Sequence, residues 1–204
     1  MNCKSLYIGI ISPILYIVAV VVGGFLRPGY SHYHNTINEL TVAGSEPLVI
    51  IIVLFFLYNI GLILIGIGPG KAVHTKLVKT TLRIVGLMGL FGGLMYFFPQ
   101  DPRNAEATTA GTIHIVMAGV LSLLTITAAV IAGFGLRLAQ QKKLASVSWG
   151  LATGILITGG LTALAVAQGW QYVGLWERFT IGMFLAWLVW FTLNVKRILY
   201  HEFI

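Results

Sequence analysis

The sequence predicts an all-α integral membrane protein: a bundle of six transmembrane helices whose N- and C-termini are cytoplasmic. Three observations predict this fold class, namely the composition, six long apolar runs and an uneven distribution of charge. Of the 204 residues, 57% are hydrophobic and only 9% are charged, which leaves little polar sequence for a soluble domain. We therefore expect residues 1–204 to form a single six-helix transmembrane domain.

Each of the six apolar runs is close to the length of a membrane-spanning helix. About 20 residues in a helix cross the ~30 Å hydrocarbon core of a bilayer. The runs cover residues 6–26, 48–68, 80–98, 112–136, 147–167 and 178–199. The first run follows Lys4 and resembles a signal peptide, but it is too long and lacks a small-x-small cleavage site before Arg27. We expect it to remain as a helix.

The charged residues separate between the two sides of the predicted membrane. Ten of the 13 Lys and Arg residues fall on the side of the N-terminus: Lys4, Lys71, Lys76, Lys79, Arg83, Arg137, Lys142, Lys143, Lys196 and Arg197. The opposite side carries Arg27, Arg103 and Arg178 together with five of the six acidic residues, which are Glu39, Glu46, Asp101, Glu106 and Glu177. Because cytoplasmic loops carry the excess of Lys and Arg, this pattern predicts that both termini are cytoplasmic, in a plasma (inner) membrane.

The net charge of +7 has the same explanation, since basic helix ends meet anionic lipid headgroups at the cytoplasmic surface. We therefore expect membrane lipids as partners and no nucleic acid. A second copy of the chain or another membrane protein is a further possible partner. The single cysteine, Cys3, excludes an intramolecular disulfide and a cysteine metal cluster.

The first outer loop, from Arg27 to Pro47, has the signals of a short surface helix. The run Thr36-Ile37-Asn38-Glu39 fits a capping box, in which the Glu39 carboxylate accepts a hydrogen bond from the Thr36 amide. This pattern predicts a helix over residues 37–43 that Gly44 stops, and Ser45 is then the expected N-cap of the second span.

The other two outer loops differ in character. In residues 99–111, Asp101 is placed to cap a helical turn that starts at Pro102. Residues 168–178 are rich in aromatic side chains, which suit the headgroup layer of a bilayer. Within the spans, two stripes of small residues predict close helix packing: Gly86, Gly89 and Gly93 in the third, and Gly150 and Gly154 in the fifth.

Polar groups are expected to gather at the outer ends of the helices. The middle thirds of the spans contain no acidic residue and no lysine, which argues against an ion-coupled transporter. His114 lies one turn below the surface if the fourth helix begins near Thr109, and Glu177 and Arg178 are expected to open the sixth helix. Spans one, three, four and six therefore converge, in this interpretation, on one outward-facing pocket.

The residues of this predicted pocket have three candidate roles. The candidates for acid–base catalysis are His114, Asp101 and Glu177. The candidates for binding an anionic or polar group are Arg27, Arg178 and Glu39. The candidate metal ligands are His32, His34 and His114, which together with acidic groups are the ligand types that hold Zn²⁺ and activate water.

Each candidate also has a structural interpretation. His114 can form a plain hydrogen bond to a neighbouring loop, Asp101 can be a helix cap, and Glu39 can belong to the capping box. Glu177 and Arg178 can form an interfacial ion pair or contact a phospholipid. Both interpretations remain open at this point, because no single residue is specific for either one.

Five short segments carry a resemblance to a known family. They are Arg27-Pro28-Gly29-Tyr30-Ser31-His32, Ile37-Asn38-Glu39-Leu40, Phe98-Pro99-Gln100-Asp101, Gly111-Thr112-Ile113-His114 and Gly174-Leu175-Trp176-Glu177-Arg178. Together they resemble the prokaryotic six-span membrane proteins called domain of unknown function 998. One departure is Asn38, where that pattern has a serine. The resemblance implies the six-span architecture and a polar outer face, and it implies no activity.

Two functions are compatible with these observations. In the first, the protein is an enzyme that acts on an outer-leaflet lipid or a lipid-linked substrate through the outer polar pocket. In the second, it is a non-catalytic, lipid- or protein-binding accessory protein whose polar cluster is structural. The sequence leaves the choice between them open.

Overall fold

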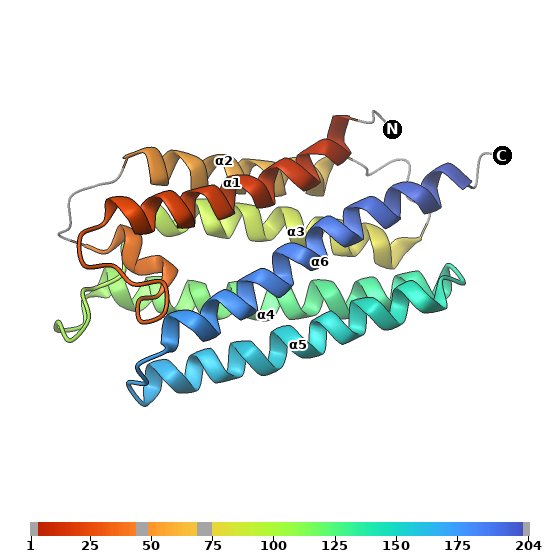
Figure 1. Ribbon diagram of the computed structural model, residues 1–204. Helices are drawn as coiled ribbons and strands as arrows, with labels where there is room; N and C mark the ends of the chain where they lie inside the picture. Colours follow the sequence, from red (N-terminus) through yellow and green to blue (C-terminus); the bar gives the residue numbers. More distant parts are fainter. Residues whose placement is uncertain (1–3, 44–48, 69–74, 202–204) are drawn as a thin grey trace.

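The computed structural model describes residues 4–43, 49–68 and 75–201, and within them the chain is helical (Figure 1). Six helices are long and apolar enough to cross a membrane: α1 (Lys4–Leu26), α2 (Val49–Ile67), α3 (Lys76–Leu94), α4 (Thr109–Leu138), α5 (Lys142–Ala167) and α6 (Val173–His201). Two short 3₁₀ helices, η1 (Ile37–Thr41) and η2 (Met95–Phe97), complete the secondary structure of these residues. The predicted all-α, multi-pass membrane fold is confirmed.

The helices form a closed bundle. Each of the six packs against the next one along the chain, and α6 packs against α1. The start of α1 and the end of α6 lie at the same end of the bundle (Figure 1). We call this end, which carries Lys76, Arg137 and Lys142, the basic end. The opposite end, which carries residues 27–43, 98–108 and 168–172, is called the loop end.

Three helices begin four or five residues earlier than the apolar runs predict. α3 starts at Lys76 instead of residue 80, α5 at Lys142 instead of residue 147, and α6 at Val173 instead of residue 178. At the basic end the reason is that lysine is a good helix former, so the helix continues beyond the apolar stretch. Glu177 therefore does not open α6, and it lies after the first turn of that helix.

The core of the bundle is built around α6. Trp187 and Phe191 are fully buried, and their rings stack with centroids 5.1 Å apart. The indole nitrogen of Trp187 donates to the Ser148 hydroxyl at 2.9 Å, and this hydroxyl donates to the Ala129 carbonyl oxygen at 2.7 Å. One buried serine therefore connects α4, α5 and α6.

Small residues allow close contact at some of the predicted positions. A Cβ on Gly86 would lie 3.0 Å from the Cα atom of Gly66, so α2 and α3 touch through their backbones there. Gly89 also faces the backbone of α2, and Gly154 of α5 faces the Met183 side chain of α6. The predicted stripes are confirmed at these three positions. Two other members face open space within the described structure, Gly93 and Gly150.

Candidate functional site

Residues 27–43 form a cap over one side of the loop end. After α1, Gly29 turns the chain with a φ of +72°, a conformation that glycine adopts without strain. The predicted surface helix is present as the shorter 3₁₀ helix η1. Its Ile37 and Leu40 side chains are buried against α1 and α2, so apolar contacts anchor the cap. The expected stop at Gly44 and the expected N-cap Ser45 lie outside the described residues.

Glu39 holds the cap together from within. Its Oε1 atom accepts from the Thr36 amide at 3.1 Å, as the capping box predicts, and its Oε2 atom accepts from the Asn35 amide group at 2.5 Å. Arg103 from the second loop donates to Oε1 at 2.6 Å. Burial raises the pKa of the Glu39 carboxyl, but the hydrogen bonds from Asn35, Arg103 and Thr36 outweigh burial and leave the pKa below its usual range.

Glu177 and Arg178 connect α6 to the cap. The Glu177 Oε2 atom accepts from the Ile37 amide at 2.5 Å, at the start of η1. Arg178 donates through Nη1 to the Asn35 carbonyl oxygen at 2.9 Å and through Nη2 to the Tyr30 hydroxyl at 2.5 Å. Adjacent residues of one helix therefore hold two separate points of the cap.

Arg27 and Tyr30 complete this side of the loop end. The Arg27 guanidinium donates to the Leu40 carbonyl oxygen, and the Tyr30 hydroxyl donates to the Thr36 carbonyl oxygen at 2.9 Å. Burial raises the pKa of Tyr30 to about 12 despite the nearby charge of Arg178. The phenol therefore stays protonated at neutral pH and remains a hydrogen-bond donor.

The two loop histidines face different partners. Nδ1 of His32 lies 3.1 Å from Nη2 of Arg178, and burial together with that charge lowers the pKa of His32. His34 instead has Nδ1 2.7 Å from the Gln171 carbonyl oxygen. No group of three or more His, Cys, Asp or Glu side chains suited to a metal ion occurs among the described residues. The proposed zinc role of His32, His34 and His114 thus stays a prediction without a ligand cluster to support it.

His114 occupies the position that the sequence predicts, in the second turn of α4. Its Nδ1 atom lies 2.7 Å from the Phe98 carbonyl oxygen, and because a carbonyl oxygen only accepts, Nδ1 must carry the proton. The expected hydrogen bond to a neighbouring loop is confirmed. The Nε2 atom is buried and has no hydrogen-bond partner within the described part of the chain.

Asp101 closes the second loop onto the start of α4. Its carboxylate accepts from the Thr108 amide at 2.9 Å and from the Thr108 hydroxyl at 2.7 Å, and these bonds lower the pKa of Asp101. The carboxylate thus binds Thr108 instead of capping a turn at Pro102. Thr108 is itself the N-cap of α4, because its hydroxyl accepts from the Gly111 amide at 3.1 Å. A side chain at Gly111 would collide with the Asp101 carboxylate, which explains the glycine.

Comparison with known proteins assigns the chain to a family. The family model described as "Protein of unknown function (DUF998)" matches residues 10–194. The chain belongs to the DUF998 family. No curated protein and no solved structure matches it.

The segments that suggested DUF998 membership form contacts within the loop end of this structure. Arg27 and Tyr30 from the first segment and Glu39 from the second hold the cap, while Arg178 from the last reaches it from α6. The two segments from loop two and α4 meet through the hydrogen bond of His114. In this DUF998 protein the short motifs therefore describe how loops attach to helix ends.

The predicted candidates gather at the loop end, and the predicted pocket there stays a prediction. The polar residues form two groups, one around the cap and the other around His114 and Thr108. Arg103 bridges from the second loop to the cap, since it also donates to the His34 carbonyl oxygen at 2.8 Å. Sequence reasoning missed Arg103 and Thr108 as site residues. A threonine directly before an apolar helix was the available signal for Thr108.

Proposed function

We propose that this DUF998 protein is a non-catalytic binding or accessory protein of the membrane. Its polar cluster at the loop end is structural, and the cap presents a fixed surface to a lipid or protein partner. One observation carries the proposal. Seven of the eight candidate site residues form a hydrogen bond with a backbone atom, namely Arg27, His34, Glu39, Asp101, His114, Glu177 and Arg178.

Hydrogen bonds of this kind leave little capacity for a substrate. A catalytic acid or base must come within about 3 Å of the proton it transfers. One carboxylate oxygen of Glu177 accepts from the Ile37 amide, Nδ1 of His114 is hydrogen-bonded to the Phe98 carbonyl oxygen, and Nε2 of His114 is buried. Breaking these contacts would detach the loops from the helix ends. The cluster is therefore better suited to a structural role than to catalysis.

The cap and residues 168–172 together present an aromatic surface. Tyr33, Trp170 and Tyr172 are 61%, 37% and 53% exposed, and we call them the aromatic rim. The Tyr33 carbonyl oxygen accepts from the Leu175 amide at 3.2 Å, and the His34 ring lies 5.3 Å from that of Tyr172. These contacts join the two segments that carry the aromatic rim, residues 33–34 and residues 170–175. Amphipathic rings of this kind suit a headgroup layer or the centre of a protein interface.

Two sets of substitutions test the proposal. We expect His114→Ala to lower the thermal midpoint of the purified protein by several degrees, because it leaves the partly buried Phe98 carbonyl without its donor. The neighbouring exposed position supplies the matched control, Ile115→Ala, which should change the midpoint far less. The rim variant Tyr33→Ser/Tyr172→Ser should keep the midpoint and lose photo-crosslinking to its partner in cells.

A second candidate function is an enzyme that acts on an outer-leaflet lipid or a lipid-linked substrate. The specific observation in its favour is the buried Nε2 atom of His114, which carries a free lone pair because Nδ1 holds the proton. For His114 to act as a catalyst, residues 98–101 would have to move away from α4 and expose this atom. If His114→Ala retains the native midpoint and abolishes rescue of cells that lack the protein, the enzyme replaces the accessory protein as the better proposal.

A further inference from the structure

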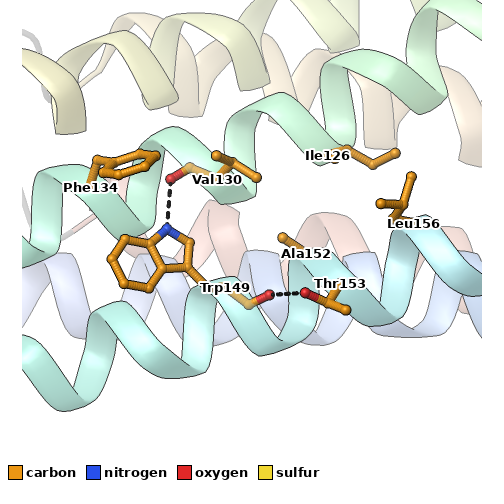
Figure 2. Close-up of a pocket in the computed structure, with 7 residues that line it drawn as sticks. All are labelled: Ile126, Val130, Phe134, Trp149, Ala152, Thr153 and Leu156. Atoms are coloured by element: carbon orange, nitrogen blue, oxygen red, sulfur yellow. Dashed lines mark hydrogen bonds between the residues drawn. The ribbon is translucent and has the colours of Figure 1, made fainter.

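A surface groove lies between α4 and α5, away from the loop end (Figure 2). Its volume is about 390 Å³, within the range of ligand pockets. Apart from Thr153, the residues that line it are apolar, and the Thr153 hydroxyl is satisfied by the Trp149 carbonyl oxygen at 3.0 Å. The groove therefore offers a mostly apolar surface to hydrocarbon.

The position of Trp149 is fixed along the groove. Its indole nitrogen donates to the Val130 carbonyl oxygen at 3.2 Å, and its ring meets Phe134 edge to face at 5.2 Å (Figure 2). Gly133 makes room for the indole, because a Cβ at that position would collide with the ring. The shape is thus built by side chains from both helices and does not depend on a mobile loop.

A second hollow continues the groove to the basic end. It has a volume of about 610 Å³ and shares Phe134 and Trp149 with the first. Its wall also contains Arg137 from the last turn of α4 and Lys142 from the first turn of α5. Both cations are exposed, and neither forms an ion pair within residues 4–43, 49–68 and 75–201.

We propose that this groove binds one anionic phospholipid. An acyl chain lies along Trp149 and Phe134, and the headgroup phosphate is held by Arg137 and Lys142. The two hollows match the two parts of a phospholipid. The apolar groove lies within the membrane and suits an acyl chain, and the two cations lie where the helices leave the membrane and suit the phosphate. Basic residues at that depth attract anionic lipid by about five-fold each.

Charge argues against a second copy of the chain as the occupant. A symmetric contact through this face would bring two sets of Arg137 and Lys142 together, and like charges facing each other oppose association. The proposal is also independent of the accessory function at the loop end, because none of its residues belongs to the cap or the rim.

Trp149 supplies a direct readout. The purified protein is placed in phosphatidylcholine vesicles that contain increasing mole fractions of either phosphatidylglycerol or phosphatidylcholine with brominated acyl chains, and tryptophan quenching is measured. The protein has five tryptophans, so the quenching of the Trp149→Phe variant is subtracted from that of the native protein to give the part of the signal that comes from the groove. Because two cations contribute about five-fold each, we expect brominated phosphatidylglycerol to quench that part at a mole fraction up to about 25-fold lower than brominated phosphatidylcholine.

Charge variants then test the headgroup contact. The double variant Arg137→Gln/Lys142→Gln should reduce the preference for brominated phosphatidylglycerol over brominated phosphatidylcholine to near one. Arg83→Gln/Lys143→Gln removes the same charge from exposed positions that do not line the hollow, and it should keep the preference for the anionic lipid. Circular dichroism and gel filtration check that each variant is folded; all four positions are exposed, so we expect them to be.

Three outcomes would overturn the proposal. The first is equal quenching by the two brominated lipids in the native protein. The second is a preference that survives Arg137→Gln/Lys142→Gln, or one that falls equally in the control, since general surface attraction would then explain it. The third is a Trp149 that neither lipid quenches in a protein that is dimeric by light scattering, which would make the face an interface between two copies.

Discussion

The loop end and the basic end of the bundle use charged residues in opposite ways. At the loop end, charged side chains reach inward and bind backbone atoms, as Arg178 does with the Asn35 carbonyl oxygen. At the basic end, Lys76, Arg83, Arg137, Lys142 and Lys143 are exposed and form no ion pair within the described part of the chain. The first set attaches loops to helix ends, whereas the second set lies exposed on the surface of the bundle.

This difference teaches that the charge distribution of a membrane protein can contain two separate signals. Unpartnered cations at one end are sufficient for the predicted orientation, because the positive-inside rule depends on location and not on contacts. Partly buried charges at the other end must be paired or solvated by the fold, since burying an unpaired charge is costly. Substitutions at the two ends should therefore have effects of very different size.

The largest effect is expected at Arg178. Arg178→Ala removes the donors to the Asn35 carbonyl oxygen and the Tyr30 hydroxyl and leaves Glu177 without a neighbouring positive charge. We expect it to destabilise the protein by about 3 kcal/mol, the upper range for hydrogen bonds to a charged group. Denaturant unfolding in detergent measures this change. The matched variant at the basic end is Arg83→Ala, and equal losses in both variants would remove the contrast between the ends.

An intermediate effect is expected from pH, and only at the loop end. The pKa of His32 is lowered in the folded protein, so below its ordinary value of 6.5 the unfolded chain binds more protons and stability falls. The pKa of Glu39 is also lowered, so its contribution is present above its ordinary value of 4.5 and is lost as pH falls through the folded value.

Hydrogen exchange of residues 30–41 between pH 7.5 and 4 measures these two losses. The His32→Gln variant should remove the loss of protection that His32 causes and leave the loss that Glu39 causes. Amides in the turn between α4 and α5 should show no comparable step once the intrinsic pH dependence of exchange is subtracted. If both regions lose protection together, the cap does not respond separately from the bundle.

The smallest effect is expected at Lys143, which is exposed in the first turn of α5. Lys143→Gln should change the free energy of unfolding by less than about 0.5 kcal/mol, as is usual for surface positions. The same denaturant measurement applies. A loss of the size expected for Arg178→Ala would show that the basic end also contains structural charges.

The sequence predicts the spans of this fold well because lipid leaves few alternatives. A backbone in hydrocarbon must satisfy its own hydrogen bonds, so a long apolar run becomes a helix. The helix ends are harder to predict: α5 continues to Lys142 because polar residues that favour helices can extend it beyond the membrane. The composition of an apolar run does not show whether its helix ends with the run or continues into the polar residues beside it.

The polar residues of the loop end are predictable as a group, but their pairings are not. Apolar runs place His114, Asp101 and Glu177 at the same end of the bundle. Their partners, however, are largely backbone groups such as the Phe98 carbonyl oxygen and the Ile37 amide. Every residue has such groups, so no sequence pattern identifies which one a side chain will meet. The capping box of Glu39 is the exception, because both partners lie in one short segment.

The bond between Glu177 and the Ile37 amide joins residues that are 140 positions apart, and this separation has a consequence for biosynthesis. A ribosome adds roughly 5–20 residues each second, so the first loop waits on the order of ten seconds before its anchoring carboxylate is made. During that interval the Ile37 amide lacks the carboxylate that accepts from it in the folded protein. The cap is therefore among the last parts of the molecule to assemble, and truncation before α6 would leave it open to proteases.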